Sequence, residues 1–306
     1  MPASALSLSR FPFRSLLVAT DMSPSAEAAL ARALHLPLTP DATIHLLHVA
    51  EGALTPDLEQ GRQIALHHAV KRSLGTAPHV NTVPALLRGD PAIEIDLHAR
   101  LVDAELLVVG RGGPANGGGV GPTTTAVLSA VDRPVLVVGA TPSDGAYRVP
   151  LVAVELDLVS ADLLVLTSRV VRRDLPEVRL LHAFAASFEG RKGLTGTELN
   201  RWGEKFQKDA QARLDEIVAA LPESSIAWRT QVAHGDPAAV VRAQARQLAA
   251  DLIVLGTHQR TGLTRWLAGS VADEVLQSVA CDVLILPVPN QERGFPPRLP
   301  LSSQQA

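Results

Sequence analysis

Aromatic residues and cysteine are scarce in this chain, and each scarcity excludes a class of protein. Of 306 residues, 3% are aromatic and one is a cysteine. With so few rings, the chain is poorly suited to stacking the bases of single-stranded nucleic acid. The lone Cys281 rules out an intrachain disulfide and indicates a reducing compartment. We expect a buried, inert thiol there, because Cys281 adjoins an apolar run typical of a strand.

Long apolar runs and an excess of positive charge are also absent. No run approaches the roughly 18 apolar residues of a membrane-spanning helix, and the net charge is −3. Without a broad basic field, the chain has little means of holding nucleic acid or an anionic membrane surface. The opening residues MPASALSLSRFPFRS hold no apolar core of signal-peptide length. We therefore expect a cytoplasmic protein that binds neither nucleic acid nor membrane.

The chain contains an internal duplication. LVATD (17–21) is matched by LVAVE (151–155), GDP (89–91) by GDP (235–237), and LLVVG (106–110) by LIVLG (252–256). The offset between matched residues is 134 in the first pair and 146 in the others. It changes only across segments that read as loop or helix, where insertions are tolerated. We expect two domains, 1–140 and 148–288, followed by a proline-rich flexible tail, 289–306.

Each half alternates five short apolar runs with helical segments. The expected strands are 15–20, 43–49, 79–87, 105–110 and 134–139 in the first half, and 149–154, 178–183, 226–233, 251–256 and 282–287 in the second. Near-continuous apolar strands separated by helices predict α/β domains, each with a parallel sheet covered on both faces. Asp90-Pro91 and Asp236-Pro237 place a capping acid before a proline, which marks two helix starts.

A glycine-bounded loop follows the fourth apolar run of the second half. The segment GTHQRTGLTRWLAGS runs from Gly256 to Gly269 and Ser270, where a new helix is expected. A helix N-terminus offers unpaired N–H groups and the positive end of its dipole to a phosphate, and glycine permits close approach. His258 and Arg260 can add donors or positive charge. The alternative is an ordinary strand-to-helix connection capped by Ser270.

This loop resembles that of the universal stress protein family, written G-x2-G-x9-G-[S/T] after the fourth strand. The spacing matches, with Gln259 in place of the second glycine. The resemblance covers both halves, including VADEVLQSVACDVLILPV after the loop. It implies two tandem Rossmann-like domains, each a five-stranded parallel sheet in the order 3-2-1-4-5 with helices on both faces. It also implies an adenine nucleotide as ligand, ATP or ADP, with or without Mg²⁺.

In that strand order the ligand crevice lies between strands 1 and 4, and the resemblance places an acid after strand 1 near the adenosine. In the second half the expected nucleotide-binding residues are Gly256, His258, Gln259, Arg260, Gly269, Ser270, Glu155 and His182. In the first half they are Asp21, Gly110, Gly113, Gly121 and Thr123. Asp21 has an alternative role as the N-terminal cap of a helix that starts near Pro24.

The first half departs further from the family pattern. Seven residues separate Gly113 from Gly121, against nine in the second loop, and Pro122 follows where a serine or threonine is expected. Proline removes one N–H from the helix start, although Thr123 or its neighbours could supply a hydroxyl. We expect the second half to be the main site and the first a weaker or empty one. Gln259 could crowd the phosphates or donate its amide to them.

Motifs for catalysis and metal binding are missing. The chain has no Walker A, GxGxxG, GxSxG, HExxH or CxxC motif, and His45 and His48 are expected on opposite sides of one strand. Asp21 or Glu155 could orient a water molecule or Mg²⁺, but a single acid without a nucleophile and a base does not make a catalytic site. The expected function is nucleotide-responsive regulation in a stress response, with at most weak ATPase activity. A scaffold that binds no nucleotide and a slow ATP hydrolase are the alternatives.

The duplication also predicts how the halves associate. Duplicated domains commonly keep the two-fold contact of an ancestral homodimer, and exposed edge strands need cover. We expect a pseudo-dimer in which 134–139 contacts 282–287. A homodimer of the whole chain stays open.

Overall fold

The computed structural model describes most of both halves. The described residues are 12–53, 55–77, 79–112, 119–139, 145–156, 160–172, 174–185, 196–221, 226–258 and 270–288. Four of the expected site residues, Gly113, Gln259, Arg260 and Gly269, lie outside these ranges, as does the expected tail 289–306.

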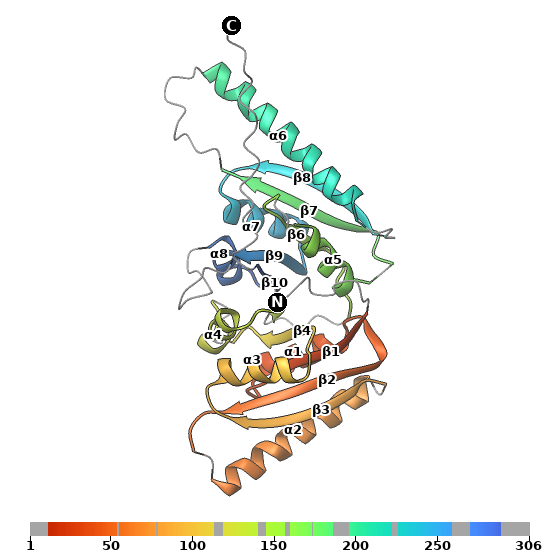
Figure 1. Ribbon diagram of the computed structural model, residues 1–306, viewed down its shortest axis with the longest axis vertical. Coiled ribbons are helices and arrows are strands. Elements are labelled where there is room, and N and C mark those ends of the chain that lie inside the picture. Colours follow the sequence, from red (N-terminus) through yellow and green to blue (C-terminus); the bar gives the residue numbers. More distant parts are fainter. Residues whose placement is uncertain are drawn as a thin grey trace, which may run out of the picture.

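Strands and helices alternate in both halves (Figure 1). The first half comprises β1 (Phe13–Ala19), α1 (Pro24–Leu34), β2 (Leu38–Ala50), α2 (Pro56–Thr76), β3 (Asn81–Arg88), α3 (Pro91–Leu101), β4 (Leu106–Gly110), α4 (Pro122–Ala130) and β5 (Val135–Val138). The second comprises β6 (Pro150–Ala153), α5 (Ser160–Val170), β7 (Glu177–Phe184), α6 (Gly196–Ala219), β8 (Ala227–His234), α7 (Pro237–Leu248), β9 (Leu252–His258), α8 (Val271–Ser278) and β10 (Asp282–Val288). Each of the ten expected strands corresponds to one of these.

β2 begins earlier than predicted, at Leu38 rather than near 43. Its first residues are partly or fully exposed and lack an apolar pattern. Leu38 is in register with Phe13 of β1, and the register then shifts before Ser15 pairs with Thr43. Pairing with β1, rather than burial, therefore extends this strand.

All ten strands form one sheet, in the order β3-β2-β1-β4-β5-β10-β9-β6-β7-β8. Within each half the strands are parallel and follow the order 3-2-1-4-5, as expected. β5 and β10 pair antiparallel at the junction, with Leu136 opposite Leu284. The contact between the last strands is therefore present, while its origin in an ancestral homodimer stays a prediction.

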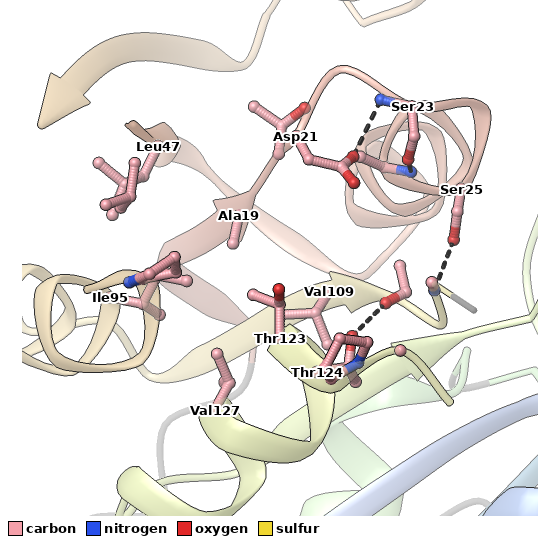
Figure 2. Close-up of a pocket in the computed structure, with 18 of the residues that line it drawn as sticks. Ala19, Asp21, Ser23, Ser25, Leu47, Ile95, Val109, Thr123, Thr124 and Val127 are labelled. Atoms are coloured by element: carbon pink, nitrogen blue, oxygen red, sulfur yellow. Dashed lines mark hydrogen bonds between the residues drawn. The ribbon is translucent and has the colours of Figure 1, made fainter. Parts of the chain in front are cut away.

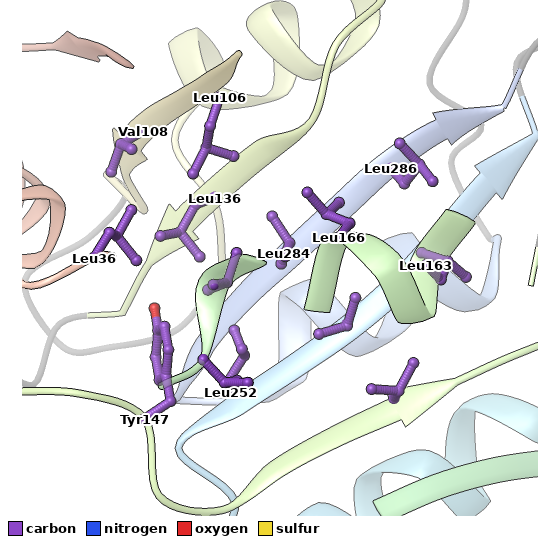
Figure 3. Close-up of a cluster of buried hydrophobic side chains, with 14 of the residues drawn as sticks. Leu36, Leu106, Val108, Leu136, Tyr147, Leu163, Leu166, Leu252, Leu284 and Leu286 are labelled. Carbon is purple, nitrogen blue, oxygen red and sulfur yellow. The ribbon is translucent and has the colours of Figure 1, made fainter. Parts of the chain in front are cut away.

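Two apolar cores run along the sheet, one on each face, and each includes both halves. α1, α2, α5 and α6 cover one face, and α3, α4, α7 and α8 cover the other. Alternation along β5 and β10 places Leu136 and Leu284 in the first core (Figure 3) and Val135, Val137 and Val283 in the second. The junction is thus packed on both faces like the interior of a single domain.

Charged side chains are also buried at the junction. Arg32 Nε of α1 lies 2.8 Å from Asp282 Oδ2 of β10, and both side chains are 4% exposed. The Tyr147 hydroxyl donates to the same oxygen (2.7 Å), and the Gly139 N–H donates to Asp282 Oδ1 (2.8 Å). On the other face, Arg111 donates to the carbonyls of Leu276 and Cys281.

The duplication extends to unusual backbone conformations. Positive φ angles recur at matched positions: Met22 (66°) and Leu156 (63°), Gly89 (149°) and Gly235 (145°), Asp103 (47°) and Ala249 (51°). Residues other than glycine rarely adopt positive φ, so this agreement shows that the two halves share details of the backbone as well as the strand order. The predicted helix starts match as well, since Asp90 caps α3 and Asp236 caps α7, each before a proline.

Candidate functional site

A cavity of about 430 Å³ opens in the first half at the carboxyl ends of β1 and β4 (Figure 2). This is the crevice predicted from the strand order. Four of the expected residues line it: Asp21, Gly110, Gly121 and Thr123. Ala19 of β1 and Val109 of β4 also line it, together with Ile95 of α3 and Val127 of α4, all labelled in Figure 2.

Asp21 lies at the exit of β1 but does not cap α1. Its Oδ1 accepts the N–H of Ser23 (2.9 Å), and Ser23 is the N-cap, whose side chain accepts from Ala26 N. The alternative prediction that Asp21 caps the helix is therefore wrong, because the cap is Ser23, two residues further on. Met22 between them holds φ at 66°. This local strain turns the chain sharply and leaves the exposed carboxylate at the cavity.

The packing around Gly110, at the end of β4, requires a glycine. A Cβ on this residue would lie 2.5 Å from Ser25 Oγ and 2.6 Å from the Ser25 carbonyl. Ser25 Oγ in turn accepts the N–H of Gly112 (3.1 Å). The start of α1 therefore presses directly on the end of β4, and no side chain fits between them.

α4 points its N-terminus into the cavity. Its N-cap residue is Gly121, which has no side chain to accept a hydrogen bond from the helix N–H groups, and Pro122 is the first helical residue. Thr124 Oγ1 donates to the Gly110 carbonyl (2.9 Å) and Thr125 Oγ1 to the Gly121 carbonyl (3.2 Å). Thr123 is exposed and lines the cavity. Of these three threonines, Thr123 is thus the one best placed to offer a hydroxyl to a ligand.

Arg62 lines this cavity, and the buried His48 contacts Arg62 and Thr20 of its lining, although sequence reasoning selected neither His48 nor Arg62. The buried His48 donates from Nδ1 to the Thr20 carbonyl (2.7 Å), and the Arg62 guanidinium faces its Nε2. Burial lowers the pKa of His48, and the Arg62 charge lowers it further. The imidazole is therefore neutral, and Arg62 is a cation in the cavity wall. The signal available in the sequence was the match between His48 and His182, 134 residues apart.

The second half has a corresponding cavity of about 310 Å³. Three expected residues, Glu155, His182 and Gly256, meet there with Phe184 and with Val271 at the start of α8. Ser270 is the N-cap of α8 and accepts the Asp273 N–H (3.1 Å), the position that both interpretations of this loop gave it. His258 ends β9.

His182 repeats the geometry of His48. Its Nδ1 donates to the Val154 carbonyl (2.9 Å), and burial lowers its pKa. The ring stacks on Phe184, which packs against Phe206 with ring centroids 4.4 Å apart. In both halves a buried neutral histidine thus holds the end of the central strand, beside the acid that follows it.

Other features of the described residues bear on function. His45 lies against His98 of α3 while His48 faces α2, so the two point to opposite faces as predicted. Within the described ranges, no three His, Cys, Asp or Glu side chains are grouped as metal ligands. No helix among the described residues is long and apolar enough to cross a membrane.

Several known proteins resemble this chain, some along most of its length and others over about a third of it. The model of the Universal stress protein family matches residues 12–139 and 147–287. A universal stress protein of Mycolicibacterium smegmatis is 26% identical over 303 residues, covering 89% of this chain and 96% of its own. One of Methanocaldococcus jannaschii is 35% identical over 89 residues, 29% of this chain. That match and one to a Synechocystis universal stress protein span about half of each relative, 52% and 54%.

Solved structures show the same fold. A universal stress protein from Archaeoglobus fulgidus aligns with a TM-score of 0.60 and 16% identity, covering 89% of this chain and 98% of that one. A functionally unknown protein of Pseudomonas aeruginosa aligns with a TM-score of 0.63 and 18% identity, covering 94% and 96%. With both halves matched by the family model, the chain belongs to the universal stress protein family.

Proposed function

We propose that this chain binds an adenine nucleotide, ATP or ADP, with or without Mg²⁺, and acts as a nucleotide-responsive regulator in a stress response. The observation that carries the proposal is a crevice built twice from the same parts. In each half an acid, a strained residue and a buried histidine end the central strands, and a helix N-terminus faces them.

The parts of the crevice suit the parts of a nucleotide. The N-termini of α4 and α8 favour phosphate through unpaired N–H groups and the helix dipole. Asp21 and Glu155 can accept hydrogen bonds from ribose hydroxyls or an adenine amine. The cavity of about 430 Å³ in the first half falls within the usual range for small-molecule sites.

We place the main site in the second half. Its loop keeps the family spacing from Gly256 to Gly269, and Ser270 supplies a hydroxyl where the first half has Pro122. Its described cavity is lined by Phe184, His182 and Leu255, an apolar surface for an adenine ring. The first half, in which Thr123 replaces the serine, is the weaker or empty site.

Two matched substitutions test the proposal and the assignment. Ala19 and Ala153 end β1 and β6 at equivalent positions, and each lines its own cavity. Leucine at either position should fill that cavity, so Ala153→Leu should weaken ATP binding at least ~10-fold. Ala19→Leu should leave the tighter binding step unchanged. Calorimetry on nucleotide-free protein measures both, and circular dichroism checks folding.

The outcomes separate the alternatives. If wild-type protein shows no heat with ATP or ADP at millimolar concentration, with or without Mg²⁺, the chain is a scaffold and the proposal fails. If Ala19→Leu alone abolishes binding, the two halves are assigned the wrong way round. ADP released steadily from ATP would instead identify a slow hydrolase. Mass spectrometry of the denatured protein shows which adenine nucleotide co-purifies.

A further inference from the structure

α3 exposes a stripe of large apolar side chains. Ile93, Leu97 and Leu101 are 58%, 55% and 79% exposed, and their spacing of four places them along one side of the helix. The opposite side is buried in the core through Ala92, Ile95 and Ala99. Together the three residues form an apolar patch along one side of the helix, and contiguous exposed apolar patches on a monomer are often functional.

The duplication supplies an internal comparison for this stripe. α7 is the equivalent helix, and its buried residues Ala238, Val241 and Ala245 match those of α3 at the offset of 146. At the three stripe positions, however, α7 has Ala239, Ala243 and Gln247. The fold therefore needs the inner face of this helix but does not need large apolar residues outside.

We propose that a second copy of this chain covers the stripe, with α3 packed antiparallel on α3 about a two-fold axis. Side chains spaced four apart form the ridges that interlock when two helices pack. A symmetric contact uses the same patch twice. It therefore buries both stripes, which form the apolar centre of an interface that needs about 800 Å² per partner.

The charges of α3 fit an antiparallel copy. Its first turn carries Glu94 and its last turn Arg100. Arg100 is bound to Asp96 and Asp132 within the chain, yet its side chain stays 46% exposed. In an antiparallel pair each first turn lies near the partner's last turn, and the two helix dipoles oppose each other favourably. α7 has no acidic residue in its first turn, so it lacks the acidic first turn of α3 as well as its apolar stripe.

Analytical ultracentrifugation of the full chain, nucleotide-free and at increasing concentration, tests the proposal. Wild-type protein should form a dimer. Leu97→Glu should weaken dimerisation at least ~100-fold, because the buried charge is introduced twice in a symmetric contact. Ala243→Glu, at the matched position of α7, should dimerise like the wild type. Leu97 is exposed, so the substitution leaves the core intact, and circular dichroism checks this.

Cross-linking gives a second readout at the same position. Leu97→Cys should join two chains through a short bismaleimide, because Leu97 lies at the centre of the stripe. Ala243→Cys should not. The native Cys281 does not interfere, since burial raises the pKa of its thiol to about 11. A wild-type chain that stays monomeric at every concentration overturns the proposal, as does a dimer that Leu97→Glu leaves intact. Because no nucleotide is present, either failure is independent of the proposed binding function.

Discussion

At the scale of single residues, two buried histidines fix the strand ends that carry the acids of the two cavities. His48 and His182 each donate to the carbonyl of the residue before the crevice acid. Their pKa values are lowered mainly by burial, so protonation would place a charge where water cannot solvate it. The carboxylates of Asp21 and Glu155 are thus presented by a strand end that depends on a neutral ring.

This dependence predicts a loss of stability in mild acid. The unfolded histidines titrate near the ordinary value of 6.5, while the folded ones hold their protons less tightly. Below pH 6.5 the unfolded state therefore binds more protons, and the free energy of unfolding should fall as pH falls. His48→Asn keeps an N–H donor but cannot titrate, so its urea-unfolding curves should depend less on pH. An identical pH dependence in the variant and the wild type would contradict the assignment.

At the scale of elements, the start of α1 and the end of β4 are closely packed. Ser23 caps the helix, Ser25 binds the N–H of Gly112, and Gly110 leaves no room for a side chain. These contacts position α1 and the strand that borders the cavity at the same time. The contacts of Ser25 with Gly110 and Gly112 join residues more than eighty positions apart, and no local pattern in either segment predicts them.

Gly110→Ala should therefore lower the free energy of unfolding by about 2 kcal/mol, because the new Cβ meets the Ser25 backbone, which cannot move aside. Gly61→Ala is the control, since Gly61 lies inside α2 and a Cβ there meets nothing within 4 Å. That change should raise stability by about 0.5–1 kcal/mol through helix propensity. Chemical denaturation compares the two. If the two substitutions changed the free energy of unfolding equally, a Cβ at Gly110 would not clash with Ser25.

At the scale of the whole molecule, the β5–β10 junction makes one body of the two halves. Its apolar residues extend both cores, and Arg32, Tyr147 and Asp282 form a buried polar cluster across it. Burial and the nearby Asp282 raise the pKa of the Tyr147 hydroxyl, which stays a donor. A buried ion pair of this kind adds little net stability, but loss of one partner leaves a charge without compensation.

Asp282→Ala should consequently destabilise the whole chain by about 3–5 kcal/mol. Glu216→Ala, which removes the exposed Arg213–Glu216 pair on α6, should change stability by less than about 1 kcal/mol. Adding Arg32→Met to Asp282→Ala should recover part of the loss, since no buried charge is then left alone. Calorimetric unfolding tests this. A double variant no more stable than Asp282→Ala would mean that the cluster acts through Tyr147 and Gly139 instead.

The sequence by itself determined the duplication, the α/β class, the ten strands and the capped starts of α3 and α7. Periodic burial and capping are local properties, written in neighbouring residues, and the family resemblance supplied the strand order. Only the tertiary structure decided that β2 begins at Leu38, that Ser23 rather than Asp21 caps α1, and that Arg62 joins the first cavity. The cap at Ser23 follows from the backbone turn at Met22, a conformation that the residue types alone do not reveal. The start of β2 and the place of Arg62 depend on register and on contacts between distant segments, because a side chain's partner across a sheet or a helix interface is not encoded in its neighbouring residues.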